Sequence, residues 1–195
     1  MRLDLTAKSF GPRAVLGSLT LQVGRGQRVA LLGPSGIGKS TLVRIVAGLD
    51  HDFDGTLSGD DRLALVFQEP TLLPWRDALA NITIPTGCGP DDARALMAEV
   101  GLAGREAQFP RQLSLGQQRR LALARAFAAR PDILLMDEPF ASLDADTATR
   151  MIALTGALLD RSGAGLILVT HDPAEPARLG AAAMVLSGNP AILHR

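Results

Sequence analysis

The chain has 195 residues, of which 47% are hydrophobic, and this length and composition suit one folded domain with a sizeable core rather than a disordered chain. Its 20 Lys and Arg balance its 20 Asp and Glu, which argues against a general nucleic-acid binder because such proteins usually carry excess basic charge. The single cysteine, Cys88, excludes an intrachain disulfide framework, and no segment has the pattern of a secretory signal or a membrane-spanning helix.

Short strands and one helix are predicted in the first part of the chain. Residues 3–10 and 18–23 alternate apolar and polar side chains, which is typical of half-buried strands. Residues 28–32 form a nearly continuous apolar run, which fits a buried strand. A glycine-rich loop follows over 33–38, and residues 40–49 then place apolar side chains at helical spacing.

A helical segment separates further buried strands in the rest of the chain. Strands that alternate with helices predict a parallel sheet covered on both faces. The helical segment interrupts this alternation, so we expect a helical subdomain over about 69–130, inserted into a core of about 1–68 and 131–195. The predicted elements are strands at 63–67, 133–136 and 166–170, helices at 91–101, 117–130 and 144–161, and two short strands within 181–193.

The glycine-rich loop carries a phosphate-binding pattern. Gly33-Pro34-Ser35-Gly36-Ile37-Gly38-Lys39-Ser40 matches G-x-x-x-x-G-K-[ST] in full, between a predicted strand and a predicted helix. Glycines let the backbone turn its N–H groups toward an anion, and the helix adds its positive N-terminal end. Lys39 would contact the β- and γ-phosphates of ATP, Ser40 would bind Mg²⁺, and we assign Thr41 to the same site. An incidental glycine turn is the alternative, which the flanking patterns oppose.

Polar side chains end three of the buried strands. Because ligands bind at the carboxyl ends of parallel strands, we expect Asp137 to support Mg²⁺ and Glu138 to act as the general base on the attacking water. His171 is expected to hold the γ-phosphate and the water in line, and the amide of Gln68 to touch Mg²⁺ or the water. The alternatives are a helix cap or helix start for the two carboxylates and His171, and an ordinary surface residue for Gln68. The phosphate loop nearby in the fold favours the functional interpretation.

Together these residues resemble the nucleotide-binding subunit of ABC transporters, from Phe10 to about Asn189. The decisive element is Leu113-Ser114-Leu115-Gly116-Gln117-Gln118-Arg119-Arg120, which is similar to the family's signature segment. The family has glycine where this chain has Leu115, and leucine there could weaken the contact with nucleotide. The resemblance implies an α/β fold with a P-loop NTPase core, a mainly parallel sheet, a small N-terminal antiparallel β-region and the inserted helical subdomain.

The resemblance also implies that two copies pair head to tail. Each ATP would lie between the phosphate loop of one copy and Ser114, Gly116 and Gln117 of the other. Gln68 resembles the family's Q-loop residue, His171 its switch histidine, and 142–144 the loop that crosses the dimer interface. Phe10 stands where the family places an aromatic ring on adenine, with ordinary core packing as an equal alternative.

The segment from Gln68 to Trp75 is expected to dock a membrane permease, because an apolar patch that holds the only tryptophan of the sequence beside leucines suits a partner helix. Burial in the helical subdomain is the alternative for Leu72 and Leu73. The string LLPWRDALANI is similar to importers of nitrate, sulfonate, taurine and thiamine precursors. The resemblance thus implies ATP-driven uptake at the cytoplasmic face of the cell membrane, with a permease and a solute-binding protein. The alternatives are an ABC-class ATPase outside transport and a nucleotide-binding module with weak hydrolysis.

The segment between Ser40 and Gln68 is brief compared with the family. We therefore expect the antiparallel β-region to be trimmed. Because the sequence also stops soon after its last predicted strand, we expect no regulatory domain.

Overall fold

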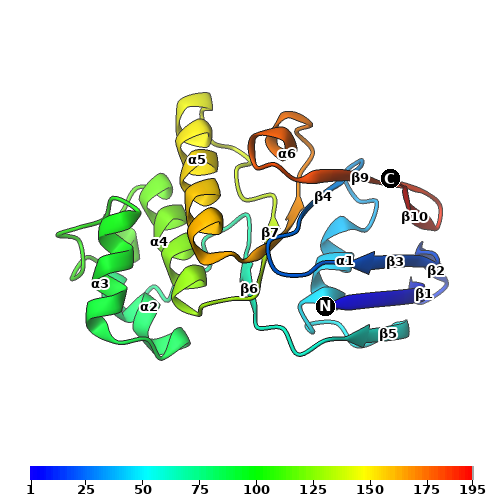
Figure 1. The fold of residues 1–195 in the computed structure, drawn as a ribbon, viewed down its shortest axis with the longest axis horizontal. Helices are drawn as coiled ribbons and strands as arrows, with labels where there is room; N and C mark the ends of the chain where they lie inside the picture. Colours follow the sequence, from blue (N-terminus) through cyan, green and yellow to red (C-terminus); the bar gives the residue numbers. More distant parts are fainter. Residues whose placement is uncertain (195) are drawn as a thin grey trace.

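A sheet of ten strands extends through the protein in the computed structural model, which describes residues 1–194 (Figure 1). Its parallel part follows the order β9-β4-β8-β7-β6. Within it, β8 is apolar and buried along its whole length, and β7 is apolar and buried up to Asp137 at its end, because helices cover both faces of this part. The strands of the parallel part are β4 (Arg28–Leu32), β6 (Leu63–Val66), β7 (Ile133–Asp137), β8 (Gly165–Val169) and β9 (Ala182–Gly188).

The predicted N-terminal antiparallel region is also present. Strand β1 (Arg2–Phe10) pairs antiparallel with β2 (Arg13–Leu16), β3 (Leu19–Gln22) and β5 (Asp54–Ser58). Strand β10 (Ala191–His194) joins this region to the parallel part, because it pairs antiparallel with β9 and parallel with β2. The sequence analysis missed β2 and β5, which are short; β5 is exposed at every position and so lacks an apolar pattern.

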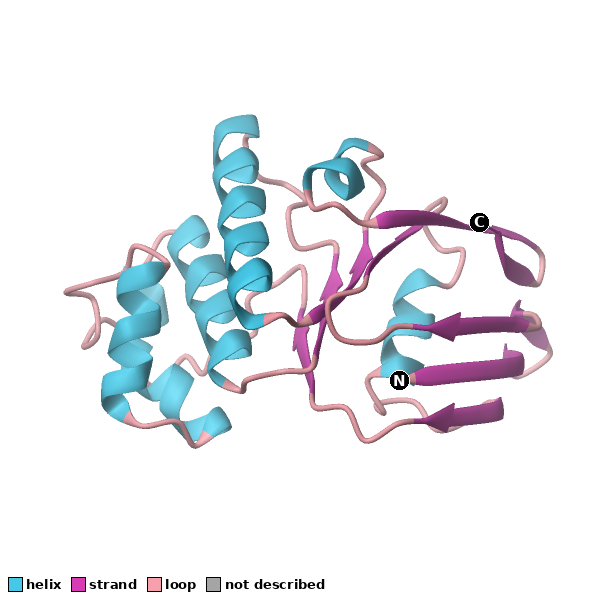
Figure 2. Cartoon of the chain, viewed as in Figure 1, coloured by secondary structure: helices cyan, strands magenta, loops and turns pink. Residues whose placement is uncertain are grey.

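Three of the helices gather at the end of the protein opposite to the antiparallel strands, and no strand lies among them (Figure 2). They are α2 (Ala78–Thr86), α3 (Pro90–Glu99) and α4 (Leu115–Ala128), with a 3-10 turn (Pro110–Gln112) between α3 and α4. All of them lie in the segment for which a helical subdomain was predicted. The subdomain boundaries stay a prediction. The remaining helices are α1 (Lys39–Val46), α5 (Ala145–Ser162) and α6 (Ala174–Arg178).

Helix boundaries differ from the prediction where local caps act. Helix α4 begins two residues earlier than expected, because Ser114 caps the backbone N–H of Gln117 and the Gln117 side chain caps Ser114 in return. Helix α1 ends at Val46 rather than at residue 49, and Gly48 follows with a φ of 67°. Helix α2 was missed because its apolar residues follow no clear helical period and Pro85 lies inside it.

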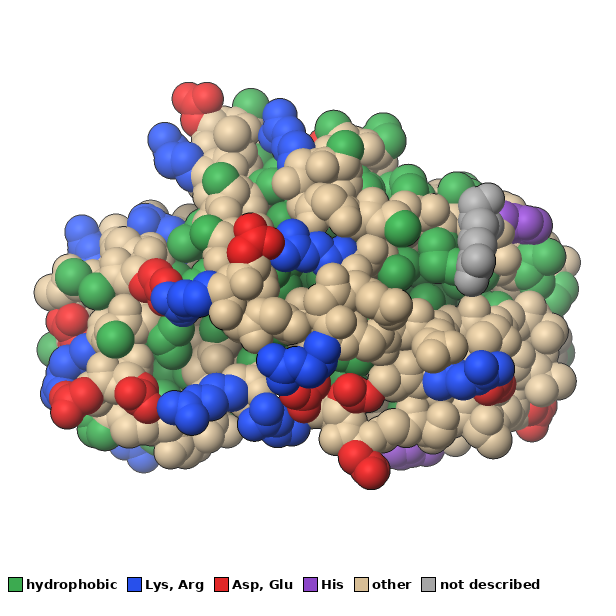
Figure 3. Space-filling model, in the orientation of Figure 1, with side chains coloured by type: hydrophobic (Ala, Val, Ile, Leu, Met, Phe, Trp, Pro, Cys, Tyr) green, Lys and Arg blue, Asp and Glu red, His purple; other side chains and the backbone are tan. Residues whose placement is uncertain are grey.

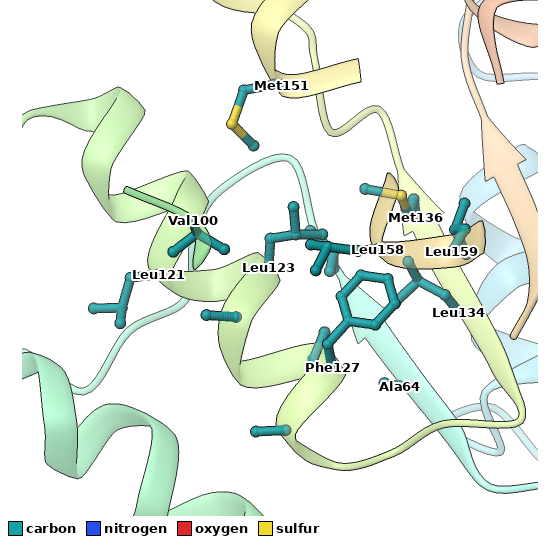
Figure 4. Close-up of a cluster of buried hydrophobic side chains, with 14 of the residues drawn as sticks. Ala64, Val100, Leu121, Leu123, Phe127, Leu134, Met136, Met151, Leu158 and Leu159 are labelled. Atoms are coloured by element: carbon teal, nitrogen blue, oxygen red, sulfur yellow. The ribbon is translucent and has the colours of Figure 1, made fainter. Parts of the chain in front are cut away.

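Two apolar cores lie on opposite faces of the parallel strands. Alternate side chains of β7 belong to different cores: Ile133 and Leu135 pack with α1, whereas Leu134 and Met136 pack with α4 and α5. Figure 4 shows the second of these cores, in which Phe127 from α4 lies beside Leu134 and Leu158. Each fully buried leucine stabilises the fold by about 1.5–3 kcal/mol. The cores therefore hold the carboxyl ends of the strands in fixed positions.

Acidic and basic side chains are interspersed on the face that Figure 3 shows, in keeping with their equal numbers in the sequence. Within residues 1–194, no helix combines the length and the apolar character that a membrane span requires.

Candidate functional site

The carboxyl ends of three neighbouring parallel strands carry the predicted phosphate loop, carboxylates and histidine. The strand order β4-β8-β7 places the ends of these strands side by side at one edge of the sheet. The backbone N–H of Glu138 donates to the carbonyl of Val169 over 2.9 Å, which ties the end of β7 to the end of β8. The sheet topology thus gathers residues that are more than 100 positions apart in the sequence.

The phosphate loop has glycine at both ends, where the backbone φ is positive and a Cβ atom would meet a neighbouring strand. Gly33 has a φ of 153°, and a Cβ atom there would lie 2.5 Å from the carbonyl oxygen of Leu186. Gly38 has a φ of 115°, and its Cβ would lie 2.7 Å from Cδ2 of Leu16. At Gly33 a side chain would push the loop away from the backbone of β9, and at Gly38 it would displace the Leu16 side chain and strain the backbone, so glycine lets the loop lie close to the sheet.

Lys39 lies inside this loop. Its side chain is buried, and Nζ donates to the carbonyl oxygens of Gly33 over 2.7 Å and Pro34 over 3.0 Å. The other lysine, Lys8, is held differently: Nζ donates to Asp50 Oδ1 over 2.9 Å and also contacts Asp52. Lys8 therefore joins β1 to the segment after α1, whereas Lys39 is the lysine that the loop encloses.

Asp137 has one carboxylate oxygen that lacks a partner. The Ser40 hydroxyl lies near this carboxylate, and Oδ1 is buried and has no hydrogen-bond partner among residues 1–194. Burial raises the pKa of Asp137, as does the charge of Glu138, while Ser40, Arg44 and Lys39 act in the opposite direction. A buried carboxylate with a free oxygen beside a hydroxyl is a ligand set that suits a divalent cation.

Glu138 adopts an unusual backbone conformation. Its φ is 47°, a left-handed conformation that costs about 1–3 kcal/mol for a non-glycine residue. This conformation turns the side chain toward the loop after β8, where Oε2 lies 3.3 Å from Nδ1 of His171. The His171 side chain is 61% exposed, so it is accessible to a ligand that binds beside Glu138. Such strain is typical of functional sites.

Part of the predicted site lines a cavity of about 290 Å³ at this edge of the sheet, whereas Asp137 and His171 are not among its lining residues. Phe10 is 51% exposed there, so the alternative that it packs in the core is wrong. Arg13 and Val15 also line the cavity, and the sequence analysis missed both because it missed β2. The predicted residues that line it are Phe10, Ser35, Gly36, Gly38, Lys39, Ser40, Thr41 and Glu138. Of the remaining loop residues, Pro34 holds Lys39 and Ile37 packs against the core.

Other predicted residues lie at separate cavities. Gln68 is exposed and lines a cavity of about 580 Å³ together with Leu115 and Arg119. Ser114 and Gly116 line a third cavity, of about 720 Å³. Ser142, Leu143 and Asp144 line that third cavity too. One chain therefore does not bring its own signature segment to its own phosphate loop.

The signature segment also has a local structural role. Gln117 Oε1 accepts from the backbone N–H of Ser114 over 2.8 Å, and Ser114 Oγ accepts from the backbone N–H of Gln117 over 3.3 Å. The two side chains thus form a capping box at the start of α4. Leu115 is the first residue of this helix, and its side chain is 49% exposed.

Comparisons with known proteins give consistent results. The profile of the family described as "ABC transporter" matches residues 16–141. The Aliphatic sulfonates import ATP-binding protein of Streptomyces avermitilis is 47% identical over 191 residues, which cover 95% of this chain and 76% of that protein. The protein of the same name from Mycobacterium sp. is 45% identical over 195 residues, covering 96% and 80% of the two chains.

Solved structures agree with the sequence comparisons. A dimeric bacterial ABC transporter cassette superimposes with a TM-score of 0.83 at 28% identity, covering 100% of this chain and 96% of that one. A dimeric ATP-binding cassette in a post-hydrolysis state, bound to ADP and Pi, gives a TM-score of 0.81, also at 28% identity, and covers 100% and 97%. The predicted P-loop NTPase fold is thereby confirmed, and the chain belongs to the ABC transporter family as one of its ATP-binding, ATP-hydrolysing cassettes.

Proposed function

We propose that this cassette powers substrate uptake through a separate membrane permease, using ATP hydrolysis in a head-to-tail dimer. The observation that carries the proposal is the convergence of the phosphate loop, Asp137, Glu138 and His171 at the ends of β4, β7 and β8. The similarity to proteins named as import ATP-binding proteins supports uptake as the direction of transport.

ATP would bind with its phosphates in the 33–40 loop. The loop N–H groups and the start of α1 favour an anion there, and Lys39 would exchange its two carbonyl partners for phosphate oxygens. Thr41 lies beside Ser40 and would contact the same phosphates. The half-exposed ring of Phe10, on the wall of this cavity, would stack on adenine.

Ser40 and Asp137 would hold Mg²⁺, since Asp137 Oδ1 is buried and lacks any other partner within the described chain. When bound, this ion would neutralise charge on the phosphates. Glu138 would accept the proton of the attacking water, and His171, 3.3 Å from Glu138, would keep the water and the γ-phosphate in line. Gln68 would reach this cavity only if the segment after β6 moved toward it, because its own cavity is separate.

A second copy would complete the site. Ser114 and Gly116 open onto a cavity of their own, so the positive start of α4 is available to a phosphate bound by another chain. Gln117 would keep Ser114 in place through the capping box. Ser142 and Asp144 share that cavity and would lie at the same interface.

The permease would dock on the segment from Gln68 to Trp75. Trp75 is 68% exposed, yet the loop around it is fixed: the Asn81 side chain, which is fully buried, bonds the backbone of Leu73 and Arg76. Leu72 packs against the core, in agreement with the alternative that it is buried in the helical subdomain, and this packing anchors the loop. A rigid loop with one exposed aromatic ring binds a partner at low entropic cost. A solute-binding protein would deliver the cargo from the far side of the membrane.

Dimer formation can be tested with hydrolysis blocked. Glu138→Gln with Mg-ATP is expected to double the mass seen by light scattering, because ATP would stay between the two copies. Adding Ser114→Arg to this variant should keep the protein monomeric while one chain still binds ATP. A dimer that survives the second substitution would refute pairing through the signature segment.

Uptake can be tested in cells that lack the gene. The wild-type chain is expected to restore growth on an alkanesulfonate as sole sulfur source, because the relatives are named for that cargo. Lys39→Ala serves as the inactive control. Restored ATP turnover without restored growth on any tested anion would contradict the proposed role in uptake.

A further inference from the structure

A cavity of about 580 Å³ separates the start of α4 from the segment that follows β6. Its floor contains Arg119, which is 6% exposed. Glu69 is the one acidic residue on its wall. The lining residues are Gln68, Glu69, Pro70, Thr71, Leu72, Leu115, Gln118 and Arg119.

Two nitrogens of the Arg119 guanidinium are buried without a hydrogen-bond partner among residues 1–194. Neither Nε nor Nη1 has a hydrogen-bond partner in the described part of the chain, and burial lowers the pKa of the group. The next arginines of the same helix are satisfied: Arg120 donates to the carbonyl of Val100 over 3.1 Å, and Arg125 donates to Thr71 over 2.9 Å and to Pro70 over 3.1 Å. A buried charge without hydrogen bonds is costly, and among these three arginines of the described chain Arg119 is the one whose buried nitrogens lack a hydrogen-bond partner.

Glu69 does not supply that counter-charge. It is exposed, and no ion pair joins it to Arg119 among residues 1–194. The cavity wall is also fixed, because Arg125 ties the backbone of Pro70 and Thr71 to α4. Thr71 keeps a φ of 44° in this arrangement. A rigid cavity with a fork of free N–H donors suits a carboxylate, which accepts two of them at once.

The occupant is expected to come from the membrane partner. The cavity begins at Gln68 and is continuous with the docking segment that ends at Trp75, whereas the phosphate loop and Ser114 line other cavities. Resting on the permease docking proposed above, we propose that Arg119 binds an acidic side chain of the permease inserted into this cavity.

The test measures binding of the labelled subunit to the detergent-purified permease encoded with it. Arg119→Gln is expected to raise the dissociation constant at least about tenfold, because truncating one side of a buried ion pair weakens a complex strongly. The thermal midpoint of the isolated variant should stay equal or rise, since an unpaired buried charge is removed. Arg111→Gln, the same change at an exposed arginine of the helical segment, is the matched control and should leave binding unchanged.

Trp75→Ala separates this proposal from the docking proposal. If Trp75→Ala weakens binding but Arg119→Gln does not, docking stands and the role of Arg119 is refuted. If neither weakens binding, docking on this segment fails as well. A lower thermal midpoint for Arg119→Gln would assign Arg119 to fold stability and overturn the proposal, as would a loss of ATP-driven dimerisation, which would place the carboxylate on a second copy.

A charge exchange provides the final arm of the test. Arg119→Glu should abolish binding to the wild-type permease. Replacing one acidic residue on the cytoplasmic side of the permease with arginine should restore it. If replacing each of those acidic residues in turn restores no binding, the ion pair is refuted.

Discussion

Nδ1 of His171 lies 3.3 Å from Oε2 of Glu138, at the ends of two adjacent parallel strands. The arrangement joins the proposed general base to the residue that would orient the water. The sheet fixes this arrangement. The backbone N–H of Glu138 donates to the carbonyl of Val169, and the positive φ of Glu138 directs its carboxylate toward His171. The hydrogen bonds of the surrounding strands thus stabilise the unfavourable backbone conformation of Glu138.

Glu138→Gln is expected to lower steady-state ATP turnover by roughly 10²–10⁴ while nucleotide affinity stays within about twofold. The amide keeps the size of the side chain but cannot accept the proton of water. Phosphate release under saturating Mg-ATP and binding of a fluorescent ATP analogue measure the two quantities. Turnover like that of the wild type would mean that another group acts as the base.

Lys39→Ala is expected to weaken ATP binding by at least about tenfold, because charge-assisted hydrogen bonds to phosphate are each worth roughly 1.5–3 kcal/mol. Isothermal titration with Mg-ATP measures the loss. Arg2→Ala, at an exposed position whose side chain pairs with Asp4, is a control that removes a charge elsewhere. Equal affinities for Lys39→Ala and the wild type would remove the phosphate loop from its assigned role.

Asp137→Asn is expected to make the nucleotide-free protein more stable by about 1 kcal/mol, or about 2–4 °C in Tm, while Mg²⁺-dependent turnover is lost. Burial raises the pKa of Asp137, so the folded protein carries a charge that it solvates poorly, and the amide removes that charge. Thermal unfolding without nucleotide, followed by an ATPase titration with Mg²⁺, tests both parts. A marked fall in Tm would show that the carboxylate stabilises the fold instead.

Glu175→Gln tests a buried carboxyl group behind the His171 loop. Glu175 is 8% exposed, Oε2 lacks a partner within residues 1–194, and burial raises its pKa above 4.5. Because the folded pKa is higher than the unfolded pKa, this group favours folding most below pH 4.5, and that contribution is lost as the pH rises. The Tm of Glu175→Gln minus that of the wild type should therefore grow between about pH 4 and pH 7. A difference that is constant over this range would contradict a raised pKa.

Leu115→Gly restores the residue that the family has in the signature segment. Without a side chain, the start of α4 can approach a phosphate on the second copy more closely, so ATP turnover is expected to rise. The cost is about 0.5–1 kcal/mol of helix stability, which thermal unfolding would register. Leu115→Ala is the matched control, because it shortens the side chain but retains the Cβ atom. Turnover that falls in the glycine variant would indicate that the leucine is part of the working interface.

Local patterns predicted most of the fold and most of the site. The parallel strands were found within about two residues, because buried strands leave short apolar runs in the sequence. The phosphate loop, Asp137, Glu138 and His171 were found because each directly follows such a run. Strand β2 was missed, and with it Arg13 and Val15 on the cavity wall, since four residues are too few to show alternation.

The amino-acid sequence by itself determined which residues could bind a phosphate and where the strands that carry them end, because both depend on residues that are neighbours in the chain. Only the tertiary structure decided which of them share a cavity. It placed Gln68 apart from the phosphate loop and left Arg119 buried without a counter-charge. Burial and pairing of a side chain depend on segments that are distant in sequence and are brought together by the order of strands in the sheet, which no local pattern records.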